Sequence, residues 1–267
     1  MAGGAPTAGF LTVDGVRLEY RCVAAPTDAG DAAPTLVLLH EGLGSIGLWK
    51  NFPDRLAATT GLGVFLWSRA GFGRSDPVPL PRPLDYLERE VPLVGRVLEA
   101  AGVHRPVLVG HSDGGTIALL YAAREDAGHI EGVVTMAAHV FVEDVTIAGI
   151  LEAKGAWETG DLRSRLSRWH GDNVECAFHG WCDTWLDPAF RAWNIEAQIA
   201  PVRAPVLAMQ GCDDQYGTRA QVDAIVAAVA GPTEAMMLPG CGHSPHTDRP
   251  DGVIAAIGQF VAGLPGR

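Results

Sequence analysis

Long hydrophobic runs and runs of positive charge are both lacking in this sequence. No apolar stretch reaches the roughly 18 residues that a membrane-spanning helix needs, and the first ten residues, MAGGAPTAGF, lack the basic and apolar regions of a signal peptide. Acidic residues outnumber basic ones by 31 to 20, for a formal net charge of -11, which disfavours binding to a phosphate backbone. We therefore expect a cytoplasmic protein that neither spans a membrane nor binds nucleic acid.

Cysteine is scarce and its spacing matches no metal motif. The five cysteines are an odd number at irregular intervals, unlike the spacing of zinc ligands. We interpret them as reduced and structural; a redox or nucleophilic role for Cys212 or Cys241 is the less favoured alternative. The sequence indicates neither a metal nor an organic cofactor. Its 267 residues, nearly half of them hydrophobic, suffice for one large globular core.

Apolar runs typical of buried strands alternate with amphipathic helical patterns along most of the chain. An opening β-hairpin is expected over residues 10–23, because Asp14-Gly15 favours a tight turn between alternating segments. A loop rich in Ala, Gly and Pro follows over residues 24–34. Further strands are expected at residues 35–40, 64–68, 106–110, 132–138, 205–211 and 234–240, and helices at 84–101, 113–125, 219–230 and 252–261. This order predicts a doubly wound, mostly parallel α/β sheet.

The alternation is interrupted over residues 139–200. Charged residues, tryptophan and short helical patterns predict an inserted helical cap there, with residues 1–138 and 201–267 forming the core domain. The aromatic side chains of this segment, including Trp181 and Trp185, either wall an apolar substrate pocket or form the cap's own small core. Both interpretations stay open at this point, and the two tryptophans are candidate substrate contacts.

The segment Gly110-His111-Ser112-Asp113-Gly114 lies between a buried strand and an apolar helix. A serine hydroxyl is a poor nucleophile unless a neighbouring base removes its proton, so a catalytic serine needs special presentation. A sharp turn between strand and helix lifts such a hydroxyl above the sheet. Glycine at positions 110 and 114 lets the backbone segments approach each other closely. The pattern therefore predicts that Ser112 is a nucleophile.

Four motifs then resemble those of the α/β-hydrolase family, in the family's order. VLVGHSDGGTIALLYA resembles the nucleophile elbow, LLHEGLGS the oxyanion loop, SRAGFGRSD the next strand-to-loop signature, and GCGHSPHTDRP the catalytic histidine loop. The resemblance extends from the opening hairpin to the last helix, apart from the cap. It implies an eight-stranded-type α/β-hydrolase sheet and acyl transfer by a Ser-His-Asp triad.

The resemblance also implies the partners of Ser112. His243 occupies the position of the base, and Asp214, the fourth residue of a G-x-x-D pattern, occupies that of the acid that orients it. The carboxylate at this position would hold the imidazole in one tautomer and stabilise the imidazolium that forms. The alternatives kept open are Asp213, Glu143 or Asp144 as the acid and His246 as the base.

Two backbone amides, those of Gly42 and Asp113, are expected to form the oxyanion hole. The sequence departs from the family pattern at Glu41, where a second glycine often follows the histidine. Glu41 either contacts substrate, tunes His243 or makes a structural hydrogen bond. His139 follows a strand and either faces the pocket or is a structural histidine.

These residues favour hydrolysis of a carboxylic ester or thioester with a small apolar or aromatic acyl group, through an acyl-enzyme on Ser112. The expected partner is therefore a small-molecule acyl substrate, and no pattern indicates an oligomeric state. Similar triads and caps also serve hydrolytic cleavage of C–C bonds in ring-fission diketones, or related lyase reactions. A third reading is a ligand-binding protein that retains the scaffold without turnover.

Overall fold

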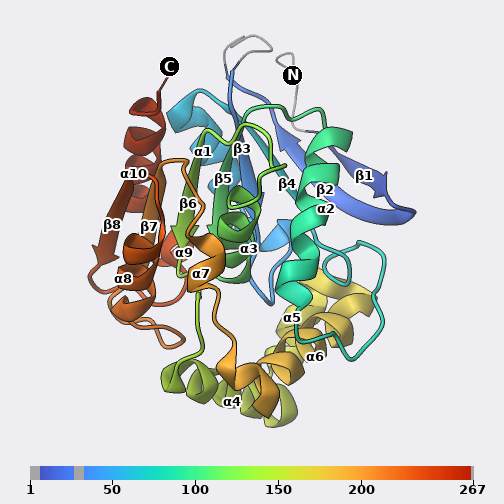
Figure 1. Ribbon diagram of the computed structural model, residues 1–267. Helices are drawn as coiled ribbons and strands as arrows, with labels where there is room; N and C mark the ends of the chain where they lie inside the picture. Colours follow the sequence, from blue (N-terminus) through green and yellow to red (C-terminus); the bar gives the residue numbers. More distant parts are fainter. Residues whose placement is uncertain (1–6, 27–32, 266–267) are drawn as a thin grey trace.

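The computed structural model describes residues 7–26 and 33–265. Its sheet has eight strands in the order β1-β2-β4-β3-β5-β6-β7-β8 (Figure 1). β1 runs antiparallel to β2 and β2 antiparallel to β4, whereas all other neighbours are parallel, so the prediction of a mostly parallel sheet is confirmed. The strands are β1 Thr7–Val13, β2 Val16–Val23, β3 Thr35–Leu39, β4 Gly63–Trp67, β5 Pro106–His111, β6 Gly132–Met136, β7 Val206–Gly211 and β8 Thr233–Leu238.

The predicted opening hairpin is present. Val13 pairs with Val16 across a two-residue turn in which Asp14 and Gly15 have φ values of 51° and 80°. Positive φ at both positions is typical of the type I′ turn, which Asp-Gly favours. Part of the loop predicted after β2, residues 27–32, lies outside the described residues.

Helices cover both faces of the sheet (Figure 1). α2, α3 and α8 pack on one face and α1 and α10 on the other. Successive β3 side chains alternate between the two faces, Val37 and Leu39 toward the first and Leu36 and Leu38 toward the second, which is why the strand is a continuous apolar run. The helices of the core are α1 Phe52–Thr60, α2 Tyr86–Ala100, α3 Asp113–Ala122, α8 Arg219–Ala228, α9 Pro245–Asp248 and α10 Pro250–Ala262, and the short 3-10 helix η1 is Ile46–Trp49.

Sequence reasoning missed α1 and misplaced some helix ends. The apolar stripe of α1 is short, with Phe52 and Pro53 in the first turn and Leu56 and Ala57 in the second, and the helix packs against α10. The helix predicted over residues 219–230 ends at Ala228, because Val229 adopts an extended backbone. Tertiary packing decides both cases, and a local pattern does not carry that information.

Most of the helical segment between β6 and β7 lies beyond the carboxyl ends of the parallel strands, whereas its last short helix, residues 196–199, packs beside α3 and α8 (Figure 1). The segment has an aromatic core of its own, in which Trp157 stacks on Phe178 with ring centroids 3.9 Å apart. The division of the chain into a core domain and a cap at residues 139 and 200 stays a prediction. The elements are α4 Asp144–Thr159, α5 Leu162–His170, η2 Gly171–Asn173, α6 Val174–Trp185, η3 Pro188–Ala192 and α7 Glu196–Ile199.

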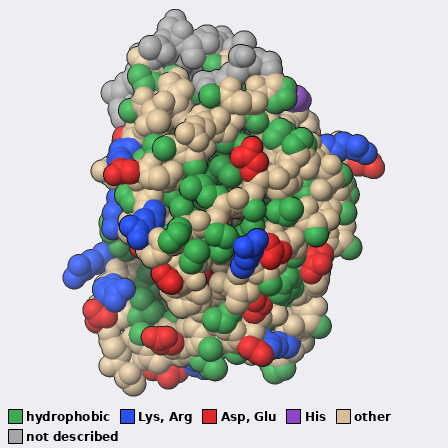
Figure 2. Space-filling view, turned by 90° about the vertical axis from the view of Figure 1, so that its left-hand side faces the viewer, with side chains coloured by type: hydrophobic (Ala, Val, Ile, Leu, Met, Phe, Trp, Pro, Cys, Tyr) green, Lys and Arg blue, Asp and Glu red, His purple; other side chains and the backbone are tan. Residues whose placement is uncertain are grey.

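None of the helices within residues 7–26 and 33–265 is long and apolar enough to cross a membrane. On the face shown in Figure 2, side chains of Lys and Arg lie beside those of Asp and Glu, with hydrophobic side chains between them. That face therefore carries charges of both signs and not a continuous positive surface.

Candidate active site

Ser112 occupies a strained turn between β5 and α3. Its φ of 50° and ψ of -119° are unusual for a residue with a side chain. The turn is held by a hydrogen bond from the Ser112 amide to the Met136 carbonyl and one from the Gly115 amide to the Ser112 carbonyl, both 2.8 Å. A Cβ on Gly114 would lie 2.1 Å from the carbonyl oxygen of Leu39, so this crossing of strand and helix accepts only glycine. These hydrogen bonds and the close packing at Gly114 hold Ser112 in its strained conformation at the carboxyl end of β5.

The structure brings Ser112, His243 and Asp214 into one line. His243 Nε2 lies 3.0 Å from Ser112 Oγ, and His243 Nδ1 lies 2.9 Å from each carboxylate oxygen of Asp214. Because a carboxylate only accepts hydrogen bonds, Nδ1 carries the proton and Nε2 is free to accept from the serine hydroxyl. The Asp214 side chain is fully buried and that of His243 is 12% exposed. This arrangement prepares the imidazole to take a proton from Ser112.

Asp214 is held as a carboxylate by several donors. The backbone amide of Tyr216 donates to Oδ1 at 2.8 Å and Gln210 Nε2 donates to Oδ2 at 2.7 Å. Burial by itself raises the pKa of Asp214, but its hydrogen bond with His243, the charge of that ring and the Tyr216 amide together lower the pKa below its ordinary value. The acid is therefore ionised at neutral pH and stabilises a positive charge on His243.

Hydrogen bonds from two side chains fix the orientation of the peptide bond between Glu41 and Gly42. Its carbonyl oxygen accepts hydrogen bonds from His40 Nδ1 at 2.7 Å and from Arg69 Nη2 at 3.0 Å. His40 Nε2 accepts from the Arg69 amide at 3.0 Å, which fixes the histidine tautomer. Since the peptide unit is planar and trans, the Gly42 N–H points away from these donors. The other expected donor, the Asp113 amide, belongs to the first turn of α3, where helix amides lack intrahelical partners.

The Asp113 side chain lies on the far side of the elbow in a buried polar network. Its Oδ2 accepts from the Tyr86 hydroxyl at 2.7 Å and from Arg69 Nη2 at 3.5 Å. The Tyr86 oxygen accepts in turn from Trp185 Nε1 at 2.9 Å. The network joins the elbow, the Glu41 peptide and α6, so Arg69 positions two expected site elements at once.

A cavity of about 70 Å³ opens beside Ser112. The four residues expected to contact substrate all line it, together with two members of the Ser-His-Asp line. Sequence reasoning missed four others, which come from the loop after β3, from α4 and from the loop after β7. The full lining is Glu41, Leu43, Ser112, His139, Thr146, Ile150, Trp181, Trp185, Tyr216 and His243.

The chain matches one known protein family and is similar to several known proteins. Residues 36–256 match the family model described as the alpha/beta hydrolase family. The chain belongs to that family. The human protein "Serine hydrolase BPHL" is 28% identical over 256 residues, covering 91% of this chain and 82% of the relative. The "2-hydroxy-6-oxo-6-phenylhexa-2,4-dienoate hydrolase" of Burkholderia cepacia is 24% identical over 264 residues, covering 88% of this chain and 90% of the relative.

Solved structures share the fold of this alpha/beta hydrolase. The enol-lactonase of Burkholderia xenovorans LB400 superposes with a TM-score of 0.71 at 20% identity, covering 95% of this chain and all of that one. At that identity the likeness establishes the fold alone. The resemblance inferred from the four sequence motifs is confirmed by the family match.

None of the alternative candidates for the acid and the base hydrogen-bonds to the Ser112 hydroxyl or to the His243 ring. Asp213 is exposed, and Asp144 pairs with Arg191. The Glu143 carboxylate accepts from the amide and hydroxyl of Thr218. His246 packs against Trp49, with ring centroids 4.7 Å apart. The structure therefore places none of the four in line with Ser112 and His243.

The five cysteines are free thiols in the structure. Across residues 7–26 and 33–265, no group of three His, Cys, Asp or Glu side chains is placed to hold a metal ion. Burial raises the pKa of Cys241 to about 11, so its thiol stays protonated at neutral pH. Cys212 is exposed beside the Asp214 loop.

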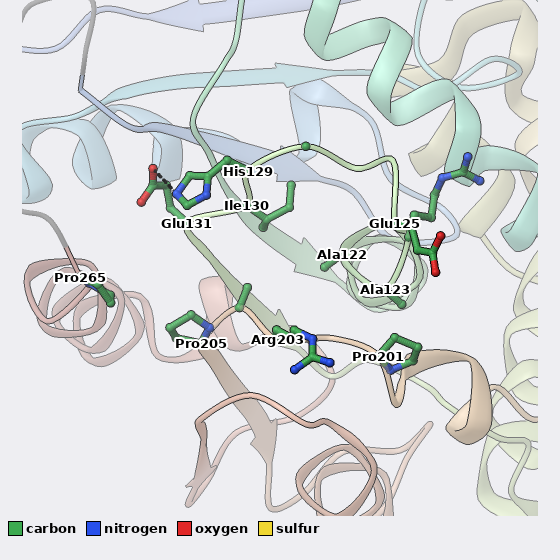
Figure 3. Close-up of a pocket in the computed structure, with 13 residues that line it drawn as sticks. Ala122, Ala123, Glu125, His129, Ile130, Glu131, Pro201, Arg203, Pro205 and Pro265 are labelled. Carbon is green, nitrogen blue, oxygen red and sulfur yellow. Dashed lines mark ion pairs between the residues drawn. The ribbon is translucent and has the colours of Figure 1, made fainter.

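A larger hollow, of about 540 Å³, lies at the opposite end of the sheet (Figure 3). Its walls come from segments before β6 and β7 and after α3, including Glu131, Arg203 and Pro205, and an ion pair joins His129 to Glu131. None of its lining residues is Ser, Thr or Cys. Because acyl transfer of the expected kind needs a nucleophile, the smaller cavity at Ser112 is the candidate site.

Two buried histidines make the folded hydrolase sensitive to acid. Burial, aided by neighbouring imidazoles, lowers the pKa of His139 and of His246 to about 3. In the unfolded chain a histidine titrates near pH 6.5, so on acidification the unfolded state takes up protons that the folded state does not. We expect each histidine to lower the free energy of unfolding by about 1.4 kcal/mol between pH 7.5 and pH 5.5.

Urea unfolding of His246→Phe at these two pH values checks this expectation. The variant should lose about 1.4 kcal/mol of the pH dependence, whereas His104→Asn, at an exposed histidine, should keep all of it. Equal pH dependence in His246→Phe and the wild type would contradict the account of His246.

Proposed function

We propose that this hydrolase cleaves a carboxylic ester or thioester with a small, uncharged acyl group through an acyl-enzyme on Ser112. The observation that carries the proposal is the unbroken hydrogen-bonded line from Ser112 through His243 to buried Asp214, set on a strained elbow. Nucleophilic serine catalysis requires this order of groups.

The reaction proceeds in two half-reactions. Ser112 Oγ attacks the acyl carbonyl carbon while His243 Nε2 takes the hydroxyl proton, and the Gly42 and Asp113 amides stabilise the negative oxygen of the tetrahedral intermediate. The intermediate collapses, the C–O or C–S bond breaks, and His243 gives its proton to the leaving alkoxide or thiolate. Water then attacks the acyl-enzyme with the same proton transfers in turn, and the acid is released. Asp214 stabilises the imidazolium in both halves.

The size and charge of the cavity favour a small neutral acyl group. A cavity of roughly 150 Å³ binds benzene, whereas the one at Ser112 holds about 70 Å³. Its lining contains no Lys or Arg. A buried substrate carboxylate without a cationic partner is strongly disfavoured.

The same features weigh against the C–C cleavage alternative. The Burkholderia cepacia relative is named for a phenyl-substituted dienoate, which carries both a phenyl ring and a carboxylate. The cavity at Ser112, of about 70 Å³, is smaller than one that binds benzene, and its lining has no Lys or Arg to pair with the carboxylate. The ester or thioester reaction is therefore the function that the geometry supports best.

A side-by-side panel of substrates tests the proposal. Purified enzyme is assayed with p-nitrophenyl acetate and butyrate, the corresponding acyl thioesters, and a ring-fission dienoate. We expect turnover of the short esters or thioesters and none of the dienoate. Turnover of the dienoate alone would overturn the ester proposal in favour of C–C hydrolysis.

Trp181 is expected to limit acyl length. A Cβ built on Gly42 would lie 2.2 Å from Cδ1 of Trp181, so the indole packs directly against the glycine whose amide faces the substrate oxygen. Replacing Trp181 with Ala opens space there, and each additional methylene buried contributes about 0.8 kcal/mol. The ratio of kcat/KM for the hexanoate ester to that for the acetate ester should rise about 15-fold, from two newly accommodated methylenes.

The matched control is Trp169→Ala, which removes a partly exposed indole that does not line the cavity. That variant should keep the wild-type preference for acyl length. An unchanged preference in Trp181→Ala, with the variant folded, would show that another residue sets the limit.

A further inference from the structure

His111, the residue before Ser112, bridges two other parts of the site. Its Nε2 lies 2.7 Å from the backbone carbonyl oxygen of His243, and its Nδ1 lies 3.3 Å from Oε2 of Glu41. The imidazole is almost completely buried, and the Glu41 side chain is 22% exposed at the cavity wall. His111 therefore touches both the loop that carries the base and the residue before the Gly42 amide.

Both partners of His111 are hydrogen-bond acceptors. A neutral imidazole has a single N–H and satisfies only one of them, whereas an imidazolium donates to both. Burial by itself lowers the pKa of His111, but the hydrogen bond and charge of Glu41 outweigh burial and raise it. Burial likewise raises the pKa of Glu41, and His111 lowers it below the ordinary value. Each partner thus favours the charged form of the other.

Among the titratable groups around Glu41, His111 supplies the positive charge that pairs with the carboxylate. The rings of His246 and His243 lie with centroids 4.8 Å and 5.3 Å from that of His111. His246 and His139 both have pKa values of about 3 and are neutral at pH 7. Asp214 contributes a further negative charge that favours the imidazolium.

We propose that Glu41 and His111 form a charged pair at the cavity wall that positions the loop of His243 and offsets the negative charge beside the oxyanion hole. The inference rests on the proposed function, because it assigns the pair to the acyl-transfer site. His111 and Glu41 are positioning residues in this account. They act through the His243 carbonyl and through the field at the Gly42 amide.

The charges of Glu41 and His111 predict how their replacement affects the transition state. A negative oxygen develops near the Gly42 amide in the transition state, and an unpaired Glu41 carboxylate next to that peptide would oppose it. His111 cancels this repulsion. Removing His111 alone should therefore be more damaging than removing both partners, which a purely structural role in packing does not predict.

A double-mutant cycle on a short ester tests this inference. His111→Gln keeps a donor for the His243 carbonyl but loses the charge, and kcat should fall about 50-fold with KM changed little. Glu41→Gln should lower kcat about fivefold. The double variant Glu41→Gln/His111→Gln should recover to the level of Glu41→Gln. A double variant no more active than His111→Gln would overturn the proposal.

The matched control is Glu131→Gln, at a buried carboxylate that pairs with His129 and Arg105 at the opposite end of the sheet. It removes an ion-paired carboxylate far from Ser112 and should leave kcat unchanged. A loss equal to that of Glu41→Gln would show that the effect is one of general stability and would overturn the proposal.

A second readout does not depend on turnover. In Ser112→Ala labelled with 15N-histidine, NMR should show the His111 ring with both nitrogens protonated at pH 7.5, and Glu41→Gln should convert it to a single-proton tautomer. A His111 ring with one proton at pH 7.5 would overturn the charged pair. If the wild type cleaves no ester or thioester, the proposed function fails, while this measurement still decides whether the pair is charged.

Discussion

Replacing Ser112 with alanine should lower kcat/KM for a short ester by about a million-fold. The hydroxyl that attacks the carbonyl is lost, and His243 has no proton to take, so catalysis falls to what the oxyanion amides and substrate binding supply. Since the Ser112 backbone has a φ of 50°, alanine at this position keeps the strain and the fold. The loss should therefore appear in kcat, with an unchanged melting temperature.

The matched control for this variant is Ser45→Ala. Ser45 is also buried and follows the loop that carries Gly42, but it does not line the cavity. Its replacement should leave kcat/KM within a few-fold of the wild type. Undiminished turnover in Ser112→Ala would show that another group is the nucleophile.

The second large effect is expected at Asp214. Asparagine there is nearly isosteric but uncharged, and its NH₂ group favours the imidazole tautomer that has the proton on Nε2. That tautomer donates toward Ser112 Oγ and does not accept its proton. We expect kcat to fall about ten-thousand-fold, with KM nearly unchanged.

The neighbouring Asp213 offers a stringent control for Asp214→Asn. The two acids are adjacent in the sequence, yet Asp213 is exposed and Asp214 is fully buried against His243. Asp213→Asn should retain wild-type kcat. A large loss in Asp213→Asn and a small one in Asp214→Asn would reverse the assignment of the acid.

The fold and the elbow at Ser112 were predictable from local signals, whereas Asp214 and His243 were assigned through the resemblance to the α/β-hydrolase family. The elbow requires glycine on both sides of the serine, at close crossings of the chain, and the sequence shows it directly. Asp214 and His243 follow late strands, and the carboxyl ends of parallel strands meet at one edge of a sheet. The pairing of residues 29 positions apart is thus a consequence of topology.

The walls of the cavity were not predictable in the same way. Thr146, Ile150 and Tyr216 carry no motif, and α4 and the loop after β7 bring them to Ser112 only through long-range packing. The Thr146 hydroxyl, for example, donates to the Tyr216 carbonyl across 70 positions of sequence. Sequence spacing carries no information on such contacts.

Arg69 and Glu41 belong to sequence motifs, but only the structure shows what their side chains contact. The sequence shows Arg69 only as part of the strand-to-loop signature SRAGFGRSD, and the structure places its guanidinium on the Glu41 carbonyl. For Glu41 three roles stay open at the level of sequence. The structure places its carboxylate both at the cavity wall and on His111, so a structural hydrogen bond and a contribution to the site coexist in one residue.

The most direct test of the central claim is to locate the adduct of a fluorophosphonate probe by peptide mass spectrometry. Such a probe traps an activated serine by forming a bond to its Oγ. We predict a single adduct on Ser112 that forms rapidly in the wild type, slowly in Asp214→Asn and not at all in Ser112→Ala. An adduct on another residue, or ester turnover by the wild type without any adduct on Ser112, would contradict the account.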